Sequence, residues 1–188
     1  MPADTSFPPV RELLPHRGSA VLLGRVLEHD AKRTVCTVDP DAGESFRDAD
    51  GSIPACVGLE FMAQTIAAHG GLLELEKARE SPGSAADSGR KSGTDTDFAK
   101  SASVPDFPTE ARPGFFVGTR RISFHVDRFA RGQPLAVTAV HLRSSAGLHA
   151  FNCSIDDGAG GPSMVSGVLT VYLLESFEAL AKDFPAND

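Results

Sequence analysis

The sequence contains few cysteines, no metal or nucleotide motif and no long apolar run, and each absence argues against a class of protein. Its three cysteines, Cys36, Cys56 and Cys153, are widely spaced and form no Cys-x-x-Cys pair. An odd number of isolated cysteines predicts reduced thiols rather than a disulfide framework or a zinc site. No HxxxH, HExxH, GxGxxG or P-loop motif occurs, so no metal, nucleotide or other cofactor is predicted.

Membrane and nucleic-acid partners are not expected either. No apolar run reaches the roughly 18 residues that a membrane span needs. The first ten residues, MPADTSFPPV, are polar and contain proline, unlike an export signal. The net charge of −7 lacks the basic surplus of a general nucleic-acid binder. We therefore expect a cytoplasmic protein that binds neither membrane nor nucleic acid.

Between residues 80 and 113 the sequence is rich in serine, glycine, aspartate, threonine, alanine and proline, with almost no large apolar side chains. Apolar burial in such a segment cannot offset the entropy lost on ordering it. The composition predicts a disordered or mobile insertion at about 80–113, within a single domain that spans 1–188.

The rest of the chain predicts a sheet and one buried helix. Apolar and β-branched residues predict strands at 21–27 and 34–38, and four antiparallel strands after the insertion. In the first of these four, alternation places Ile122, Phe124 and Val126 on one face. Apolar residues nearly all round the helix at 57–73 are typical of a buried helix, with capping from the preceding DADGS sequence. The predicted fold class is α+β, a sheet wrapped around a single helix. A short helix is expected at 177–184.

One acidic residue, Glu60, lies in the apolar part of this helix, one turn from its start. A buried carboxylate without a partner is costly, so Glu60 is a candidate general acid or base with a pKa raised by apolar surroundings. The alternative is a structural carboxylate bonded to backbone or to a dimer mate. Gln64 lies one turn further on the same face and can orient the carboxylate. N–H groups of the first turn, Cys56, Val57 and Gly58, could polarise a bound carbonyl, and Gly58 would let a ligand approach the backbone.

Three other features are candidates for function. His16, in the phrase LLPHRGSAVLLGRV, lies beside an apolar entry to the core. Cys56 could be a nucleophile activated by the helix N-terminus, but a free buried thiol is the better explanation, because no histidine lies near it in sequence. The segment TRRISFHVDRFAR concentrates basic residues in an acidic protein, so it is either a solvated surface or a docking patch for an acidic or phosphate-bearing carrier. The residues of that patch are Arg120, Arg121, Arg128 and Arg131.

Two phrases, LLPHRGSAVLLGRVLEHD and IPACVGLEFMAQTIAAHGGL, resemble the hot-dog-fold 3-hydroxyacyl-[acyl-carrier-protein] dehydratases. The helix phrase and the later segment from Pro113 to Arg128 are similar to the ApeP-like branch, which is associated with aryl polyene gene clusters. The resemblance covers most of the chain except 80–113. It implies a central helix wrapped by an antiparallel sheet, usually in a homodimer. It also implies an acyl carrier protein partner with a phosphopantetheine-linked acyl chain.

The same resemblance implies roles for the site. Glu60 matches the acid that assists hydroxyl loss, and the first turn of the helix matches the carbonyl-binding site. In such enzymes a histidine on the loop before the helix removes the α-proton, but no histidine lies between residues 29 and 69 here. His16 is the first candidate to replace it, Asp48 and Asp50 come next, and a partner subunit is another source.

The expected function is therefore a 3-hydroxyacyl-carrier-protein dehydratase of fatty acid or aryl polyene type synthesis. One alternative is a hot-dog acyl thioesterase, in which a single carboxylate activates water or attacks the thioester. The other is a non-catalytic acyl-binding subunit of a dehydratase heterodimer, which would turn over substrate only with its partner.

Overall fold

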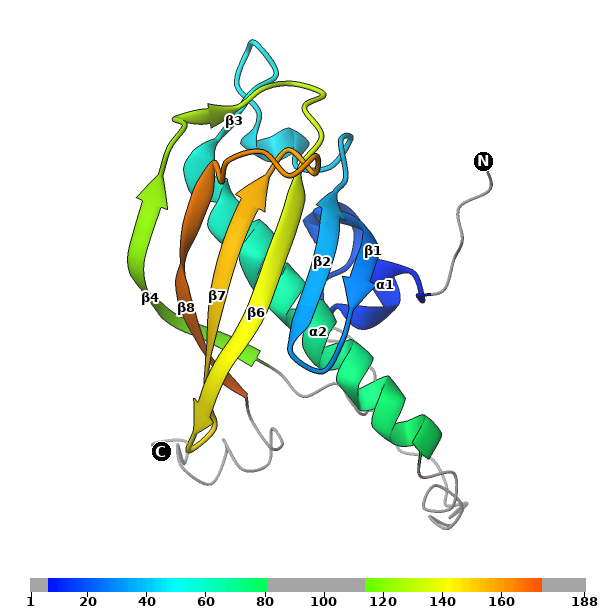
Figure 1. Cartoon of the computed structure of the whole chain (residues 1–188). Helices are drawn as coiled ribbons and strands as arrows, with labels where there is room; N and C mark the ends of the chain where they lie inside the picture. Colours follow the sequence, from blue (N-terminus) through cyan, green and yellow to red (C-terminus); the bar gives the residue numbers. More distant parts are fainter. Residues whose placement is uncertain (1–6, 81–113, 174–188) are drawn as a thin grey trace, which may run out of the picture.

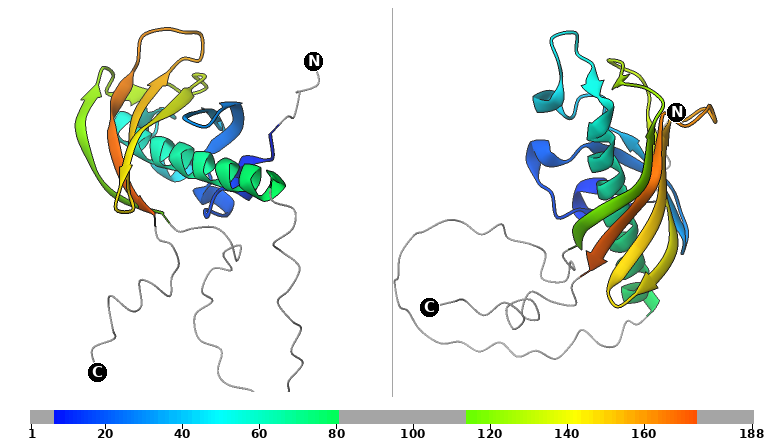
Figure 2. Two further views of the ribbon diagram at one scale, coloured as in Figure 1. Left: turned by 60° about the horizontal axis from the view of Figure 1, so that its bottom comes forward. Right: turned by 90° about the vertical axis from the view of Figure 1, so that its left-hand side faces the viewer.

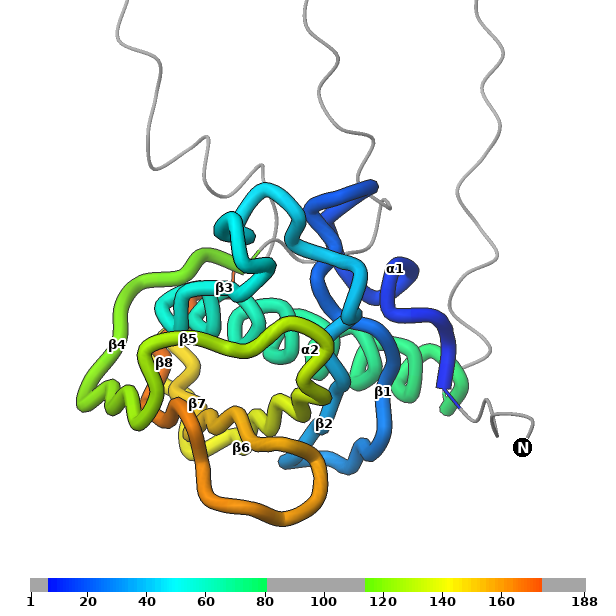
Figure 3. The backbone as a smooth tube through the Cα atoms, turned by 90° about the horizontal axis from the view of Figure 1, so that it is seen from above, coloured from blue at the N-terminus to red at the C-terminus, as the bar shows by residue number. Residues whose placement is uncertain are grey.

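The computed structural model describes residues 7–80 and 114–173. Its main helix, α2 (Gly58–Glu80), lies in the concave side of a six-stranded antiparallel sheet of order β1-β2-β6-β7-β8-β4. The view from above in Figure 3 and the two views of Figure 2 show the sheet curving around this helix. The α+β class and the single wrapped helix are thus confirmed. Most of the expected insertion at 80–113 and the expected helix at 177–184 lie outside the described residues.

The strands follow the predicted order along the chain. β1 (Leu23–His29) and β2 (Arg33–Val38) form a hairpin before α2, and β4 (Gly114–Phe124) follows the undescribed segment. β6 (Ala136–Ser145), β7 (Leu148–Asp156) and β8 (Val165–Leu173) complete the sheet. A separate two-stranded ladder joins β3 (Ile53–Pro54) to β5 (Arg128–Phe129). The short elements are α1 (Val10–Leu13) and three 3₁₀ turns, η1 (Gly18–Ala20), η2 (Glu44–Phe46) and η3 (Ala55–Val57).

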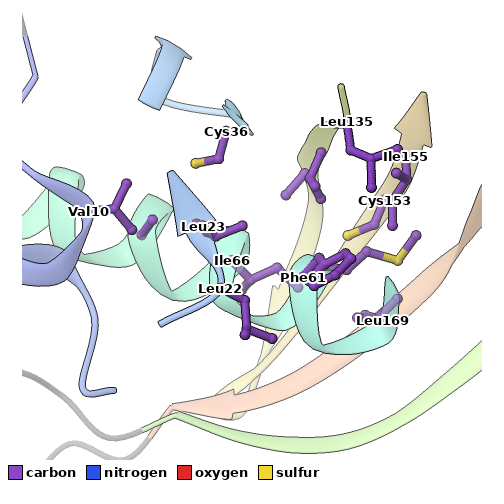
Figure 4. Close-up of a cluster of buried hydrophobic side chains, with 14 of the residues drawn as sticks. Val10, Leu22, Leu23, Cys36, Phe61, Ile66, Leu135, Cys153, Ile155 and Leu169 are labelled. Atoms are coloured by element: carbon purple, nitrogen blue, oxygen red, sulfur yellow. The ribbon is translucent and has the colours of Figure 1, made fainter. Parts of the chain in front are cut away.

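The core lies between α2 and the inner face of the sheet. Phe61, Met62 and Ile66 of α2 are buried against strand residues that include Ile155 and Leu169 (Figure 4). Full burial of each such side chain contributes about 1.5–3 kcal/mol. α2 continues beyond its predicted end, and its last turns, from Leu75 to Glu80, are exposed. No helix in residues 7–80 and 114–173 is long and apolar enough to cross a bilayer.

Two local expectations were wrong. The register of β4 against β8 shifts between Arg120 and Ser123, where Arg121 has a φ of 54°. This irregularity breaks the alternation, so Phe124 is 44 % exposed although Ile122 packs against the core. Among the described residues, none caps η3 at the start of α2 with its side chain. The Asp50 carboxylate instead accepts hydrogen bonds from the backbone N–H and hydroxyl of Ser52.

Candidate active site

Glu60 and His16 meet at the first turn of α2. The Nε2 atom of His16 lies 3.2 Å from Oε1 of Glu60. His16 comes from the loop between α1 and η1, and Glu60 lies in the first turn of α2. Their side chains are 32 % and 41 % exposed, so a ligand could reach the pair from outside the chain. The structure thus brings together the two residues that the sequence offered as catalytic candidates.

Gln64 connects this pair to the loop that carries His16. Its amide nitrogen donates to Oε1 of Glu60 at 2.9 Å and to the carbonyl oxygen of Ala20 at 2.8 Å. Its amide oxygen accepts the backbone N–H of Leu22 at 2.9 Å. The residue is 1 % exposed, and both of its amide hydrogens are engaged. In the site as it stands Gln64 therefore orients Glu60, and it has no donor left for a substrate.

The charge state of Glu60 follows from these contacts. The hydrogen bond from His16 is the main influence that lowers the pKa of the Glu60 carboxyl from its usual 4.5. Partial burial opposes this effect, and the hydrogen bond from Gln64 adds to it. The expectation that apolar surroundings raise this pKa was wrong, because it overlooked the donors. Glu60 is therefore a carboxylate at neutral pH.

The free atoms of the pair define where a substrate proton can go. Nδ1 of His16 is buried and has no hydrogen-bond partner among the described residues. Proton exchange with a ligand is therefore left to Nε2 of the ring. Both donors to Glu60 use Oε1, so Oε2 accepts no hydrogen bond from residues 7–80 and 114–173. The reactive face thus presents one carboxylate oxygen beside one imidazole nitrogen.

The first turn before α2 differs from the expected carbonyl-binding site. The Gly58 N–H bonds to carbonyl oxygens of Ala55 and Cys56, and is therefore not free for a ligand. A Cβ atom on Gly58 would lie 2.8 Å from Cδ1 of Ile155 and 3.3 Å from the Phe129 ring. The glycine thus makes room for core side chains rather than for a ligand. Cys56 is an exposed free thiol, and substrate binding at Cys56 and Val57 stays a prediction.

Asp48 and Asp50, the other candidates from the sequence, lie in the loop before α2, which several side-chain contacts hold in place. Asp48 forms an ion pair with Arg128, whose Nε also donates to the hydroxyl of Ser52 at 2.6 Å. Asp50 is bonded to the same serine. Both carboxylates therefore stabilise this loop, and the charge of Arg128 is partly neutralised there. The other three arginines of the proposed patch, Arg120, Arg121 and Arg131, are exposed, and carrier docking on them stays a prediction.

Sequence reasoning missed a buried polar cluster further along α2. The Thr34 hydroxyl lies 2.8 Å from Nδ1 of His69 and 2.7 Å from Nδ1 of His29. Burial, with a smaller contribution from His29, lowers the pKa of His69 to about 4. His69 is therefore neutral at pH 7, and its contact with Thr34 joins α2 to β2. The sequence feature that could have indicated this cluster is Thr34, a polar residue among the apolar residues of β2 that face the core.

A cavity of about 670 Å³ lies beside the His16 loop. Arg11, Arg17 and Asp39 are among the residues that line it, but His16 and Glu60 are not. This cavity therefore does not enclose the acid–base pair, which opens to the surface of the single chain.

Comparisons with known proteins identify the family of this chain. The family model of the ApeP-like dehydratases, described as ApeP dehydratase, matches residues 8–85 and 106–182. The dehydratase heterocomplex ApeI:P from Xenorhabdus doucetiae is similar in structure, with a TM-score of 0.68 and 24% identity over 95% of this chain and 99% of that one. A comparison with curated protein sequences finds no match.

More distant structures share the fold alone. An uncharacterised protein, PH1136 of Pyrococcus horikoshii, has a TM-score of 0.51 at 11% identity, covering 90% of this chain and 97% of its own. Thioesterase superfamily member 2 of zebra fish has a TM-score of 0.50 at 13% identity, covering 88% and 93%. A long helix wrapped by a six-stranded antiparallel sheet is the hot-dog fold that these structures share. Within that class, the chain belongs to the ApeP-like dehydratase family.

Proposed function

We propose that this chain dehydrates 3-hydroxyacyl thioesters carried by acyl carrier protein, with His16 and Glu60 as its acid–base pair. The observation that carries the proposal is the 3.2 Å contact between Nε2 of His16 and Oε1 of Glu60. Dehydration needs a group that accepts a proton and a group that donates one on the same face of the substrate. His16 supplies the imidazole that the loop before α2 lacks.

The reaction balances within the pair. The Glu60 carboxylate, through Oε2, takes the proton from the carbon next to the thioester carbonyl, and the electrons form the new double bond. The bond from the neighbouring carbon to the hydroxyl breaks, and His16 donates its proton so that water leaves. A proton then returns from Glu60 to His16 through the Oε1–Nε2 contact. The resemblance gave proton abstraction to a histidine. Here the lowered pKa keeps the Glu60 carboxyl ionised at neutral pH, so the carboxylate is able to accept the proton.

The second part of the proposal is a partner subunit of the same fold. The pair opens to the surface, and β4 at the end of the sheet exposes apolar side chains, which include Phe115, Phe116 and Val117. The similar X. doucetiae protein is part of a heterocomplex named ApeI:P. A second dehydratase subunit of the ApeI type, or a second copy of this chain, would cover this edge.

The function is tested with purified protein and a 3-hydroxyacyl carrier protein, alone and after mixing with an ApeI-type subunit. The acyl species are followed by mass. Wild type is expected to produce the species that has lost water. Glu60→Gln and His16→Asn are each expected to lower turnover by about 10²–10⁴-fold. Glu80→Gln and His125→Asn remove matched groups on exposed positions and should leave turnover unchanged.

The other functions have separate signatures in this assay. Release of the free acid identifies a thioesterase. Turnover that appears only with the partner, and that Glu60→Gln does not reduce, identifies a non-catalytic subunit. Full dehydration by either Glu60→Gln or His16→Asn would falsify the assigned pair.

A further inference from the structure

Arg17 follows His16 in the loop between α1 and η1, and its guanidinium group binds the backbone of that same loop. Nη1 of Arg17 donates to the carbonyl oxygen of Leu14 and to that of His16, the latter at 2.8 Å. The carbonyl oxygen of Arg11 lies at 3.5 Å from the same nitrogen. The side chain therefore spans the segment from α1 to the catalytic candidate.

These carbonyl groups need an external donor. α1 is a single turn that ends at Leu13, so carbonyl oxygens near its end have no partner inside a continuing helix. Pro15 contributes no N–H group to the turn that follows. The Nη1 group of a guanidinium carries two N–H donors, which suits the carbonyl oxygens of Leu14 and His16 at once.

The loop is fixed at its other end by Gln64. The amide of Gln64 binds the carbonyl of Ala20 and the N–H of Leu22. His16 lies between Leu14 and Ala20, which these attachments hold, and its Nδ1 accepts or donates no hydrogen bond within the described residues. The orientation of its imidazole therefore depends on how the surrounding backbone is held.

We propose that Arg17 is a positioning residue, which holds the His16 loop so that Nε2 stays against Glu60. This inference rests on the proposed function of the His16–Glu60 pair. Displacement of a reacting group by about 1 Å can lower a rate by about 100-fold. Loss of Arg17 should thus act on kcat and leave KM nearly unchanged, because Arg17 binds only backbone oxygens among the described residues.

The test is a double-mutant cycle in the dehydration assay. Arg17→Gln is expected to lower kcat by about 10- to 100-fold in the wild-type background. It should cause no further loss in a His16→Asn background, because the two residues act through one group. Arg17→Lys keeps the charge but not the planar fork, and should fall between wild type and Arg17→Gln. Arg25→Gln, an exposed arginine on β1, is the matched control and should have no effect.

Imidazole NMR gives a readout that does not depend on turnover. Arg17→Gln should shift the ring signals of His16 and leave those of His125 and His149 in place. An unchanged His16 signal overturns the positioning role, as does an equal loss of kcat in both backgrounds, which would indicate general destabilisation. If His16→Asn retains turnover, the proposed function fails. If His16→Asn loses turnover but Arg17→Gln does not, only the role of Arg17 fails.

Discussion

At the scale of single residues, Gln64 is the side chain on which the site's geometry depends. It is buried, and its three hydrogen bonds join α2, the Glu60 carboxylate and the backbone around η1. A leucine of similar size would leave the Leu22 N–H and the Ala20 carbonyl without partners, at a cost of about 1–3 kcal/mol for each buried group. Gln64→Leu should therefore lower the free energy of unfolding by about 2 kcal/mol or more in urea denaturation, and should reduce turnover as well.

Gln64→Glu separates the two roles of the amide. A carboxylate can still accept the Leu22 N–H, but it cannot donate to Glu60 and it places a like charge beside it. The pKa of Glu60 should rise, and the acidic limb of the rate profile should move to higher pH. Lys77→Gln, on the exposed end of α2, controls for charge changes elsewhere on the helix. A Gln64→Leu protein as stable and active as wild type would contradict the bracing role.

The sequence predicts one half of this geometry and not the other. Spacing of one helical turn is enough to place Gln64 beside Glu60, and the structure has that contact. The contact of His16 with Glu60 depends on a loop held by Gln64 and Arg17, so it arises from interactions between distant segments. Because the hydrogen bond from His16 could not be foreseen, the direction of the Glu60 pKa shift was also predicted wrongly.

At the scale of elements, the glycines of α2 show how closely the helix start is packed. A Cβ at Gly58 would lie 2.8 Å from Ile155, whereas a Cβ at Gly70 would meet nothing within 4 Å. Gly58→Ala should therefore destabilise the fold by about 1–3 kcal/mol through overpacking. Gly70→Ala, in the same helix, should stabilise it by about 0.5–1 kcal/mol through helix propensity. Thermal unfolding of both variants, followed by circular dichroism, measures the difference.

The two substitutions are expected to change the stability of the fold in opposite directions. Equal changes in stability would mean that the packing around Gly58 has room for a methyl group. The sequence pattern identified the helix because its apolar residues form a long, buried run. The sequence analysis explained the glycine at position 58 by the close approach of a ligand. Close packing against Ile155 requires the same small residue, so the sequence could not distinguish the two explanations. In β4 the alternation failed for a similar reason, since nothing in the sequence marks the register shift near Arg121.

The contact between α2 and β2 should also make stability depend on pH. His69 has a pKa of about 4 in the folded chain, against a usual value of 6.5. Between these values the unfolded chain binds more protons, so stability falls as pH drops from about 6.5 towards 4 and is fully present above 6.5. The loss reaches on the order of 3 kcal/mol at the low end of this window.

Urea denaturation at a series of pH values from 7.5 to 4 measures this effect, with His69→Gln as the comparison. The difference in unfolding free energy between wild type and variant should shrink as the pH falls through this window. Glu60 titrates below its usual 4.5 and contributes to both proteins, so it cancels in the difference. A difference that stays constant across the window would contradict the assignment to His69.

At the scale of the whole molecule, the sheet has two ends, and they are unlike each other. β1 at one end packs against α1, whereas β4 at the other end is the longest strand and pairs only with β8 among the described residues (Figure 1). Long edge strands with exposed apolar side chains tend to pair with another chain. The side views of Figure 2 show β4 along the open margin of the curved sheet. The hot-dog fold could be predicted from sequence phrases, but this open margin could not, because it depends on which strand ends the sheet.

The proposed partner should therefore bind along β4. Val117 is 59 % exposed, so Val117→Asp leaves the core intact while placing a charge in the middle of the apolar edge. Wild type, alone or mixed with an ApeI-type subunit, is expected to show the mass of two hot-dog chains by light scattering, and Val117→Asp the mass of one. Leu142→Asp makes a similar change at an exposed position on β6 and should leave the mass unchanged.

Because the acid–base pair opens to the surface, Val117→Asp should also lose turnover if a partner closes the site. A wild-type chain that stays single in both conditions, or a Val117→Asp chain that still pairs, would place the partner on another surface.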